Sequence, residues 1–504
     1  MNQRKAGVIL SYISTGVSSI VALVYVPMLL HYLTREQYGI YQLMGSLIAY
    51  LSVMDFGLSN TTTRYLSQAY TQQDTHRVQH IISSSFALYL AITGCLLLLG
   101  FVFYGCIGPI YKSTLSVADL SVAKQVFLVM LFNIALTIPA NIFKSAINAQ
   151  ERFVFLRGIN LIQIIIQPLM VWAVLAWKAS VLNLVLTQTA VNMLVIFLNY
   201  FYCKKSLHIS FSVSFRDKPL LKELLGFSFF IFLHCIVDQV YWRLAPLILG
   251  AVSGAAAVAS YTIALQVALF AIFLPTNMSG VFLPKLSALA TRIENLPEIN
   301  AIFCRLGRLQ FMCMMLLVVG FAFVGQTFIQ LWVGPEYSIC YWITLILIVS
   351  YILDVTQSIG IPILQAMKKH AFRAYVYIAM ALLNTLLCFP LAIYFGEIGG
   401  ALSTGICLTI GSGFVMNWYY VRVGLNMKQF FKEIGRISLA ILGAIICIKG
   451  VFVGAPIQPT WFSFLWHGVA VTCIYLACLW SGCLNDYEKQ LVVGPIQKII
   501  RHHY

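Results

Sequence analysis

The segment IISSSFALYLAITGCLLLLGFVFYGCIG, residues 81–108, contains no charged side chain. An apolar run of about 20 residues is long enough for an α-helix to cross the hydrocarbon core of a membrane. Similar runs recur along the chain of 504 residues, of which 60% are hydrophobic and 10% charged. A soluble domain carries roughly 25% charged residues. The sequence therefore predicts an all-α protein that crosses the membrane many times.

The apolar runs predict about fourteen transmembrane helices, separated by loops too short to hold a catalytic domain. Their approximate limits are 7–33, 38–59, 81–108, 121–142, 156–177, 181–202, 224–249, 257–283, 308–332, 340–364, 374–395, 398–420, 435–453 and 462–483. The N-terminal run continues to Leu33 without a signal-peptidase site, so we expect it to be retained as the first helix.

Basic residues are distributed unevenly over the predicted loops. If the N-terminus, the even-numbered loops and the C-terminus share one side, that side holds 26 of the 32 Lys and Arg residues. Cytoplasmic loops of membrane proteins carry the excess of positive charge, so we expect both termini in the cytoplasm. Basic loops that face anionic lipid head groups explain most of the net charge of +16 without a nucleic-acid partner.

Two parts of the sequence resemble each other at a nearly constant separation. NAQERFVFLR (148–157) has a counterpart in QAMKKHAFR (365–373), about 217 residues later, and GLSNTTTRYLSQ (57–68) has one in NMSGVFLPKLSA (277–288), 220 residues later. Six predicted helices separate the copies, so the repeats are parallel and related by an axis along the membrane normal.

This repeat predicts two pseudo-symmetric lobes of six helices, an arrangement suited to alternating access around a central cavity. The predicted parts are an N-terminal lobe over 1–203, a cytoplasmic linker over 204–222, a C-terminal lobe over 223–424, and two appended helices with a cytoplasmic tail over 425–504.

The stretch VMDFGLSNTTTRYLSQ (53–68) places an acid, a row of hydroxyls and a base at the predicted cytoplasmic end of the second helix. A helix that ends and meets water would explain Arg64, but it does not explain Asp55, which precedes the helix end. A charged group inside a span usually faces a cavity or a partner. Asp55 and Asn60 are therefore candidates for the lining of a polar cavity.

Arg64, Lys144 and Lys285 all end even-numbered helices on the predicted cytoplasmic side. Taken alone, each of these residues is explained as a basic residue that anchors the cytoplasmic end of its helix. As a set drawn from both lobes, they could ring the cytoplasmic mouth of the cavity and attract an anionic head group.

Further charged residues lie within predicted spans. Asp354 is near the middle of 340–364 and could line the cavity or make a polar contact between packed helices. His234 and Asp238 share one helix face at i,i+4, where they could couple transport to protons or form a buried hydrogen bond. Arg243, five residues further on, could instead snorkel to the outer interface.

The sequence contains no Walker A, G-x-S-x-G or H-E-x-x-H motif. The thirteen cysteines are scattered, with no CxxC pair and no Cys/His cluster. We therefore expect no catalytic residues, no metal site and no cofactor, and a protein that is not an enzyme.

Five stretches resemble the O-antigen (Wzx-type) flippases of the polysaccharide transporter family, within the MATE/MOP superfamily. They are LTREQYGIYQL (33–43), DFGLSNTTTRYLSQ (55–68), ILGAVSGAAAVASYTIALQ (248–266), LWVGPEY (331–337) and FGEIGGALSTGI (395–406). Together they cover both predicted lobes. Family members often carry an acid or Asn just before the "iLG" of helix 7, where this chain has RLAPLILG (243–250), so a role of that position in ion coupling is not expected here.

The resemblance implies a multi-pass protein of the bacterial inner membrane whose cargo is an oligosaccharide on undecaprenyl pyrophosphate. The cargo would move from the cytoplasmic to the periplasmic leaflet, with H+ or Na+ as candidate coupling ions and polysaccharide polymerase machinery as a candidate partner. Two other functions are alternatives: a cation-coupled small-molecule exporter of MATE type, and a membrane enzyme such as an O-antigen polymerase or ligase. The latter needs a larger periplasmic loop than this sequence provides.

Overall fold

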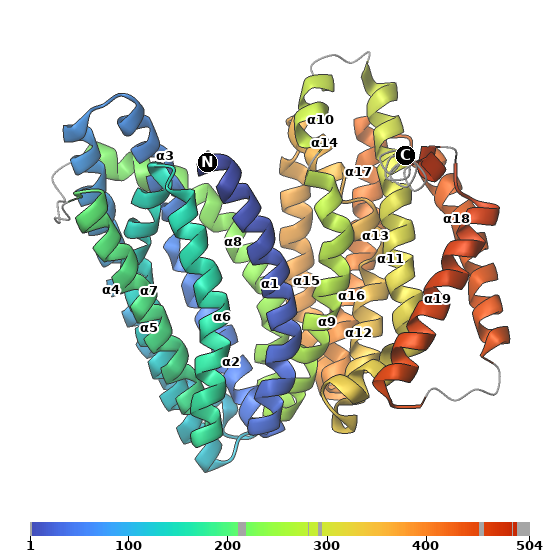
Figure 1. Cartoon of the computed structure of the whole chain (residues 1–504), viewed down its shortest axis with the longest axis horizontal. Helices are drawn as coiled ribbons and strands as arrows, with labels where there is room; N and C mark the ends of the chain where they lie inside the picture. The colour runs from blue at the N-terminus through green and yellow to red at the C-terminus, as the bar shows by residue number, and fades with distance from the viewer. Residues whose placement is uncertain are drawn as a thin grey trace, which may run out of the picture. The chain divides into compact units, whose positions relative to one another are not determined.

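The computed structural model describes residues 3–209, 218–280, 282–290, 295–452, 458–485 and 487–490, and within these ranges it contains helices and no strand (Figure 1). Contacts divide the chain into two units. Unit 1 comprises Met1–Thr262 with Cys388–Gly400, and unit 2 comprises Ile263–Leu387 with Ala401–Tyr504.

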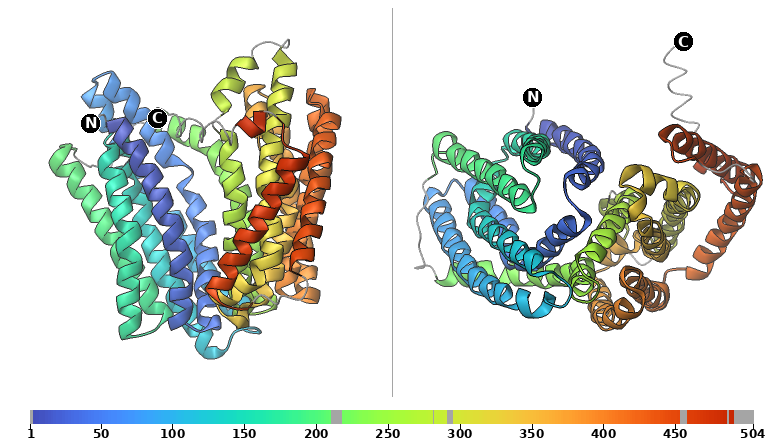
Figure 2. Two further views of the ribbon diagram at one scale, coloured as in Figure 1. Left: turned by 45° about the vertical axis from the view of Figure 1, so that its right-hand side comes forward. Right: turned by 90° about the horizontal axis from the view of Figure 1, so that it is seen from below.

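Unit 1 is built from long helices joined by short turns. In chain order they are α1 (Gln3–Tyr32), α2 (Arg35–Ser52), the 3-10 turn η1 (Val53–Asp55), α3 (Leu58–Thr71), α4 (Thr75–Tyr111), α5 (Val117–Ala149), α6 (Phe153–Trp177), α7 (Val181–Ser206), α8 (Lys218–Val252) and the first part of α9 (Ala255–Gly280). Within the unit, α5 packs on α2, α3, α4 and α7, and α1 lies along α6 (Figures 1 and 2).

Unit 2 holds the remaining helices, several of which are short. They are the rest of α9, then α10 (Leu283–Leu289), α11 (Leu296–Trp332), η3 (Pro335–Tyr337), α12 (Ile339–Ser350), α13 (Ile352–Thr356), α14 (Gly360–Ala366), α15 (Ala371–Phe395) as far as Leu387, α16 (Glu397–Leu408) from Ala401, the π-helical η4 (Thr409–Val415), α17 (Met416–Val423), α18 (Met427–Val451) and α19 (Trp461–Gly482). The end of α15 and the start of α16 belong to unit 1. The appended helices α18 and α19 both pack on α11.

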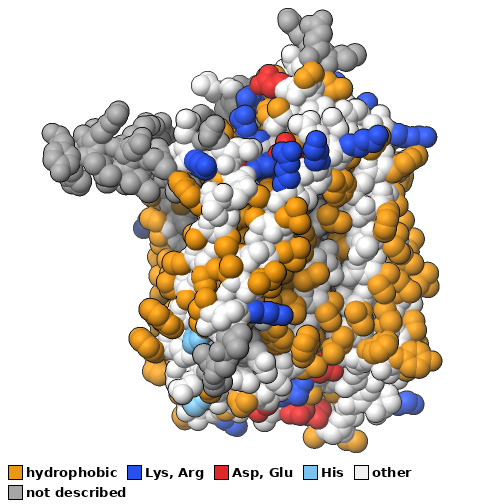
Figure 3. All heavy atoms as spheres, turned by 90° about the vertical axis from the view of Figure 1, so that its right-hand side faces the viewer, with side chains coloured by type: hydrophobic (Ala, Val, Ile, Leu, Met, Phe, Trp, Pro, Cys, Tyr) orange, Lys and Arg blue, Asp and Glu red, His pale blue; other side chains and the backbone are white. Residues whose placement is uncertain are grey.

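Each of the fourteen predicted spans coincides with helix in the structure. Within the described residues, eleven helices are long and apolar enough to cross a membrane by themselves. Of the other three spans, 224–249 lies within α8, where the described residues give only the shorter apolar helix Trp242–Val252. The last two are interrupted: 38–59 breaks at η1, and 340–364 is divided into α12, α13 and α14. On the face shown in Figure 3, over α18 and α19, hydrophobic side chains cover the middle and Lys and Arg gather toward the upper rim. The chain is therefore an all-α polytopic membrane protein.

The ends of several helices follow from local sequence. Thr34 begins α2 with a capping box, in which its hydroxyl accepts from the Gln37 amide and the Gln37 side chain accepts from the Thr34 amide.

At the other end of the second predicted span, Phe56 and Gly57 both have positive φ, 54° and 64°. Two consecutive left-handed residues cannot continue an α-helix. The second predicted span therefore stops here and restarts as α3.

Local contacts recur in the two units at a constant separation of 217 residues. Three turn hydrogen bonds after α5, from the amides of residues 150, 151 and 152, have equivalents after α14 from residues 367, 368 and 369. The stacked pair Phe155–Tyr202 recurs as Phe372–Tyr419. These recurrences are what the sequence repeat predicts.

The boundary between the two units does not fall after the sixth predicted span, because α8 makes its contacts in unit 1. This helix packs on α2, α3 and α4 and falls within unit 1. The sequence repeat places it in the second lobe, and the lobe limits derived from that repeat stay a prediction.

In unit 1, α2 approaches the start of α9 very closely at a glycine. A Cβ on Gly39 would lie 1.9 Å from the carbonyl oxygen of Ala255. Beside it, the Arg35 guanidinium donates to the Ala256 carbonyl and the Ser260 hydroxyl, and pairs with Glu397 at 3.3 Å. The missing side chain of Gly39 is what allows this polar contact between α2, α9 and the start of α16.

Gly39→Ala is expected to destabilise the protein by about 1–3 kcal/mol, because the added methyl group must displace backbone. Gly45→Ala on the same helix is the matched control, since nothing lies within 4 Å of its Cβ position. Thermal unfolding of the purified proteins in one detergent measures both. Equal melting temperatures for the two variants would contradict the close approach at Gly39.

Candidate polar binding pocket

A polar pocket of about 240 Å³ lies in unit 1 between α3, α5, α6 and α7. Most of the residues that line it carry hydroxyl, amide or basic side chains. They are Ser59, Asn60, Thr63, Lys144, Ser145, Asn148, Phe153, Leu156, Arg157, Ile159, Asn160, Gln163, Val195 and Asn199. Such a concentration of polar groups between helices with hydrophobic outer faces indicates a site for a polar ligand.

The helix break before α3 positions one wall of this pocket. Because η1 ends at Asp55, the chain turns and α3 places Ser59 against α5, where its hydroxyl lies 3.0 Å from that of Ser145. The Asp55 carboxylate accepts a hydrogen bond of 3.1 Å from the Asn141 side chain, one turn earlier on α5. Together these contacts fix α3 against α5 at the pocket.

Two cations, Lys144 and Arg157, give the pocket its charge. None of the described residues that line it is acidic. Asp55, the acid of η1, is occupied by Asn141 and by the Ser59 amide. Lys144 is partly buried and Arg157 is exposed. Cations that line a pocket without a carboxylate in its lining favour an anionic ligand.

One residue of the lining carries a buried acceptor without a partner. Asn199 is 2% exposed and lines the pocket, and its side-chain oxygen has no hydrogen-bond partner. A buried polar atom without a partner costs about 1–3 kcal/mol. A ligand hydroxyl donating to this oxygen would remove that cost.

The amide side chains of α7 form a polar face that extends away from the pocket. Gln188, Asn192 and Asn199 share one side of the helix, at spacings of four and seven residues. Gln188 donates to the hydroxyls of Tyr25 and Tyr41, at 3.0 and 3.1 Å. Asn192 donates to the side chains of Asn133 and Thr137 on α5. Unit 1 thus carries polar groups along much of the length of α7.

The structure brings only some of the predicted site residues to this pocket. Asn60 and Lys144 line it, and Asp55 supports its wall. Arg64 is an exposed residue of α3 that does not belong to the lining. Arg243 lies near the Tyr41 hydroxyl, close enough to interact electrostatically. The side chains of His234 and Asp238 lie outside the described residues.

The predicted residues in unit 2 have other surroundings. Lys285 is exposed and pairs with Glu298 at 3.3 Å. The Asp354 carboxylate accepts hydrogen bonds from the hydroxyls of Tyr377 (2.6 Å) and Ser412 (2.8 Å). These donors come from α15 and the π-helical η4, so Asp354 holds three segments of unit 2 together.

Sequence reasoning missed Arg157 and Asn199. Arg157 ends the repeated stretch 148–157, and its counterpart at the repeat separation is Ala374, so the repeat itself does not mark it as a site residue. The amide periodicity of α7 was a usable signal for Asn199, since amides are uncommon inside transmembrane helices and face partners there.

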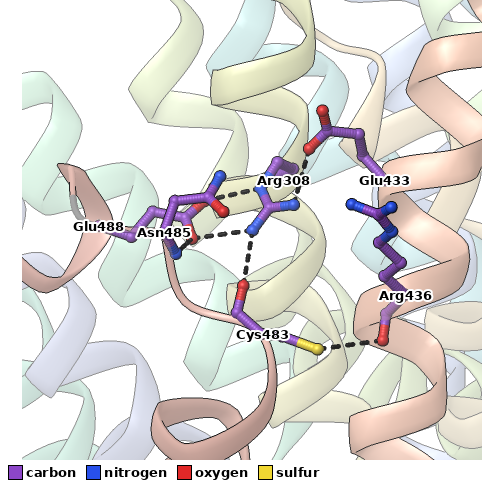
Figure 4. Close-up of polar contacts among 6 residues, drawn as sticks. All are labelled: Arg308, Glu433, Arg436, Cys483, Asn485 and Glu488. Atoms are coloured by element: carbon purple, nitrogen blue, oxygen red, sulfur yellow. Dashed lines mark hydrogen bonds and ion pairs between the residues drawn. The ribbon is translucent and has the colours of Figure 1, made fainter.

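A buried ion cluster around Arg308 was also missed (Figure 4). Its guanidinium pairs with Glu433 at 2.7 Å and makes two bonds to Glu488, at 2.7 and 2.9 Å. A further bond of 2.9 Å reaches the Cys483 carbonyl. The cluster ties α11 to α18 and to the segment after α19.

A hollow of about 690 Å³ lies beside this cluster and is larger than the unit 1 pocket. Two arginines, Arg305 and Arg308, and two glutamates, Glu433 and Glu488, line it, so their formal charges cancel. The donors of Arg308 already bond to oxygens of this chain. The hollow therefore offers less to an anionic ligand than the smaller pocket.

The chain is similar to several known proteins. A family model described as polysaccharide biosynthesis protein matches residues 5–289. A curated protein of Shigella flexneri named "Putative O-antigen transporter" is 23% identical over 396 residues, which cover 77% of this chain and 90% of that protein.

Solved structures of two transporters share the fold. The lipid II flippase MurJ, in an inward closed conformation, has a TM-score of 0.69 and 16% identity, over 94% of this chain and 99% of that one. An inward-facing multidrug resistance MATE family transporter of the MOP superfamily has a TM-score of 0.66 and 12% identity, over 82% and 95% of the two chains.

Arg308→Met is expected to destabilise the protein by about 3–5 kcal/mol, because it leaves buried carboxylates without a counter-charge. Adding Glu433→Gln and Glu488→Gln to this variant should recover most of the loss, since no net charge then stays buried. Chemical unfolding in detergent measures the three proteins. A triple variant less stable than Arg308→Met would contradict the assignment of the cluster as a charge-balanced structural site.

Proposed function

The chain belongs to the polysaccharide biosynthesis protein family, and from this premise we propose that it is a flippase for lipid-linked oligosaccharides. Its cargo is an O-antigen or related repeat unit on undecaprenyl pyrophosphate, moved from the cytoplasmic to the periplasmic leaflet. The observation that carries the proposal is the polar, basic pocket of unit 1, which no acidic residue lines among those described. The similarity to the Shigella flexneri protein, named a putative O-antigen transporter, supports an O-antigen cargo.

The physical need for such a protein follows from the chemistry of the cargo. Sugar hydroxyls and a diphosphate cannot enter hydrocarbon without partners, since each unsatisfied polar group costs several kcal/mol. Hydroxyl, amide and basic side chains in a pocket replace the lost water. The lipid tail needs no such partner and can stay in the bilayer.

The protein is a transporter rather than an enzyme, and it lies in the bacterial inner membrane with both termini in the cytoplasm. The asymmetry of the basic loops supports this orientation. Transport by alternating access is driven by H+ or Na+, and polysaccharide polymerase machinery receives the cargo.

Proteoliposomes test the function directly. The purified chain is reconstituted with an undecaprenyl-pyrophosphate-linked oligosaccharide that carries a fluorescent sugar label, and a membrane-impermeant quencher reports the leaflet of the label. We expect the label in the inner leaflet to become accessible to the quencher with the protein present, and to stay protected in protein-free vesicles.

A second set of vesicles distinguishes the exporter alternative. Movement of a cationic dye across the membrane, without movement of the labelled glycolipid, would reject the flippase and favour a MATE-type exporter. Movement of the glycolipid without the dye supports the proposed cargo.

A further inference from the structure

The unit 1 pocket has a counterpart in unit 2 at the same position of the repeat. A small cavity of about 10 Å³ in unit 2 is lined partly by Ile361, Arg373, Tyr377, Ser412 and Met416. Each lies 217 residues after a residue that lines the unit 1 pocket, namely Lys144, Leu156, Asn160, Val195 and Asn199. This is the separation at which the turn hydrogen bonds and the stacked aromatic pair recur. The two sites therefore descend from one ancestral position.

The unit 2 copy is closed by the chain's own side chains. Asp354 accepts hydrogen bonds from Tyr377 and Ser412. The Arg373 guanidinium lies 4.3 Å from the centre of the Tyr377 ring and is attracted electrostatically to Asp354. An acid of this chain thus neutralises the cation of the site, and aromatic rings fill its volume.

The unit 1 copy is open and lacks that acid. Where unit 2 has the apolar Ile361 and Met416, unit 1 has Lys144 and Asn199. Its two cations, Lys144 and Arg157, have no carboxylate beside them in the described lining, and the Asn199 oxygen is buried without a partner. The position equivalent to Asp354 is Thr137, whose hydroxyl accepts from Asn192, so the unit 1 copy has no acid at that place.

We infer that head-group recognition is asymmetric: the unit 1 pocket binds the diphosphate of a carrier lipid through Lys144 and Arg157, while its unit 2 copy binds no ligand. In unit 2 the Asp354 carboxylate compensates the charge of Arg373, as the diphosphate compensates the charges of Lys144 and Arg157 in unit 1. Asn199 accepts from a hydroxyl of the sugar next to the diphosphate. This inference rests on the proposed flippase function and assigns its binding site to one half of the repeat.

Binding of undecaprenyl diphosphate to the purified full-length protein in detergent tests the inference. We expect Lys144→Gln and Arg157→Gln each to weaken binding at least about tenfold, because each removes a charge-assisted hydrogen bond. Lys204→Gln is the matched control, an exposed lysine at the end of α7, and should bind like the wild type. Asp354→Asn in the unit 2 copy should leave the affinity within about twofold of the wild type.

Two further ligands show whether the pocket recognises the diphosphate, the lipid chain or both. Undecaprenol, which lacks the diphosphate, should bind at least about tenfold more weakly than undecaprenyl diphosphate. Inorganic diphosphate at the same concentration should not displace the lipid, and equal displacement would overturn the assignment to a lipid head group.

Other outcomes separate this inference from the proposed function. If the wild type moves the glycolipid in vesicles and Lys144→Gln and Arg157→Gln keep wild-type affinity, the site is wrong while the flippase stands. An equal loss of affinity in Asp354→Asn and Lys144→Gln would overturn the asymmetry. A wild type that moves no glycolipid rejects the function itself.

Discussion

The structure depends on one constraint: a polar group inside a membrane protein must find its partner within the protein, because hydrocarbon offers none. Many hydroxyls find their partner within their own helix, because they donate to the carbonyl four residues earlier, as Thr189 and Thr385 do. Longer side chains find their partner on another segment of the chain, as Asn192 and Arg308 do. Asn199 is one of several buried polar groups whose side-chain atom has no partner, and it lines the unit 1 pocket.

Duplication gave the chain two copies of the same local architecture, and the copies satisfied this constraint differently. In unit 2 the polar groups at the crossing of α13, α15 and η4 satisfy one another, so Asp354 stabilises the packing. In unit 1 the corresponding crossing keeps Lys144 and Arg157 beside an open volume. A repeat whose turn hydrogen bonds and stacked aromatic pair recur can thus differ strongly in chemistry.

The sequence predicted the helices well because the hydrophobic requirement acts on each span separately. Sequence reasoning also identified Asp55 as a residue that a simple helix end does not explain, and the structure shows it bonded to Asn141 beside the pocket. It did not identify Arg157 or Asn199, which reach the pocket only when α6 and α7 pack against α5. It grouped Lys285 with Lys144 and Arg64 at the cytoplasmic mouth of a cavity, and this grouping stays a prediction; in the structure Lys285 is exposed and pairs with Glu298.

The sequence by itself determined the all-α membrane class, the positions of the helices and the repeat, since each depends on residues close together in the chain or on a fixed separation. The tertiary structure decided which copy of the repeat stays open. That outcome depends on whether an acid such as Asp354 lies beside the cation, and helices far apart in the sequence bring these groups together. The physical reason is that charge compensation acts over a few ångströms in space, whatever the separation along the chain.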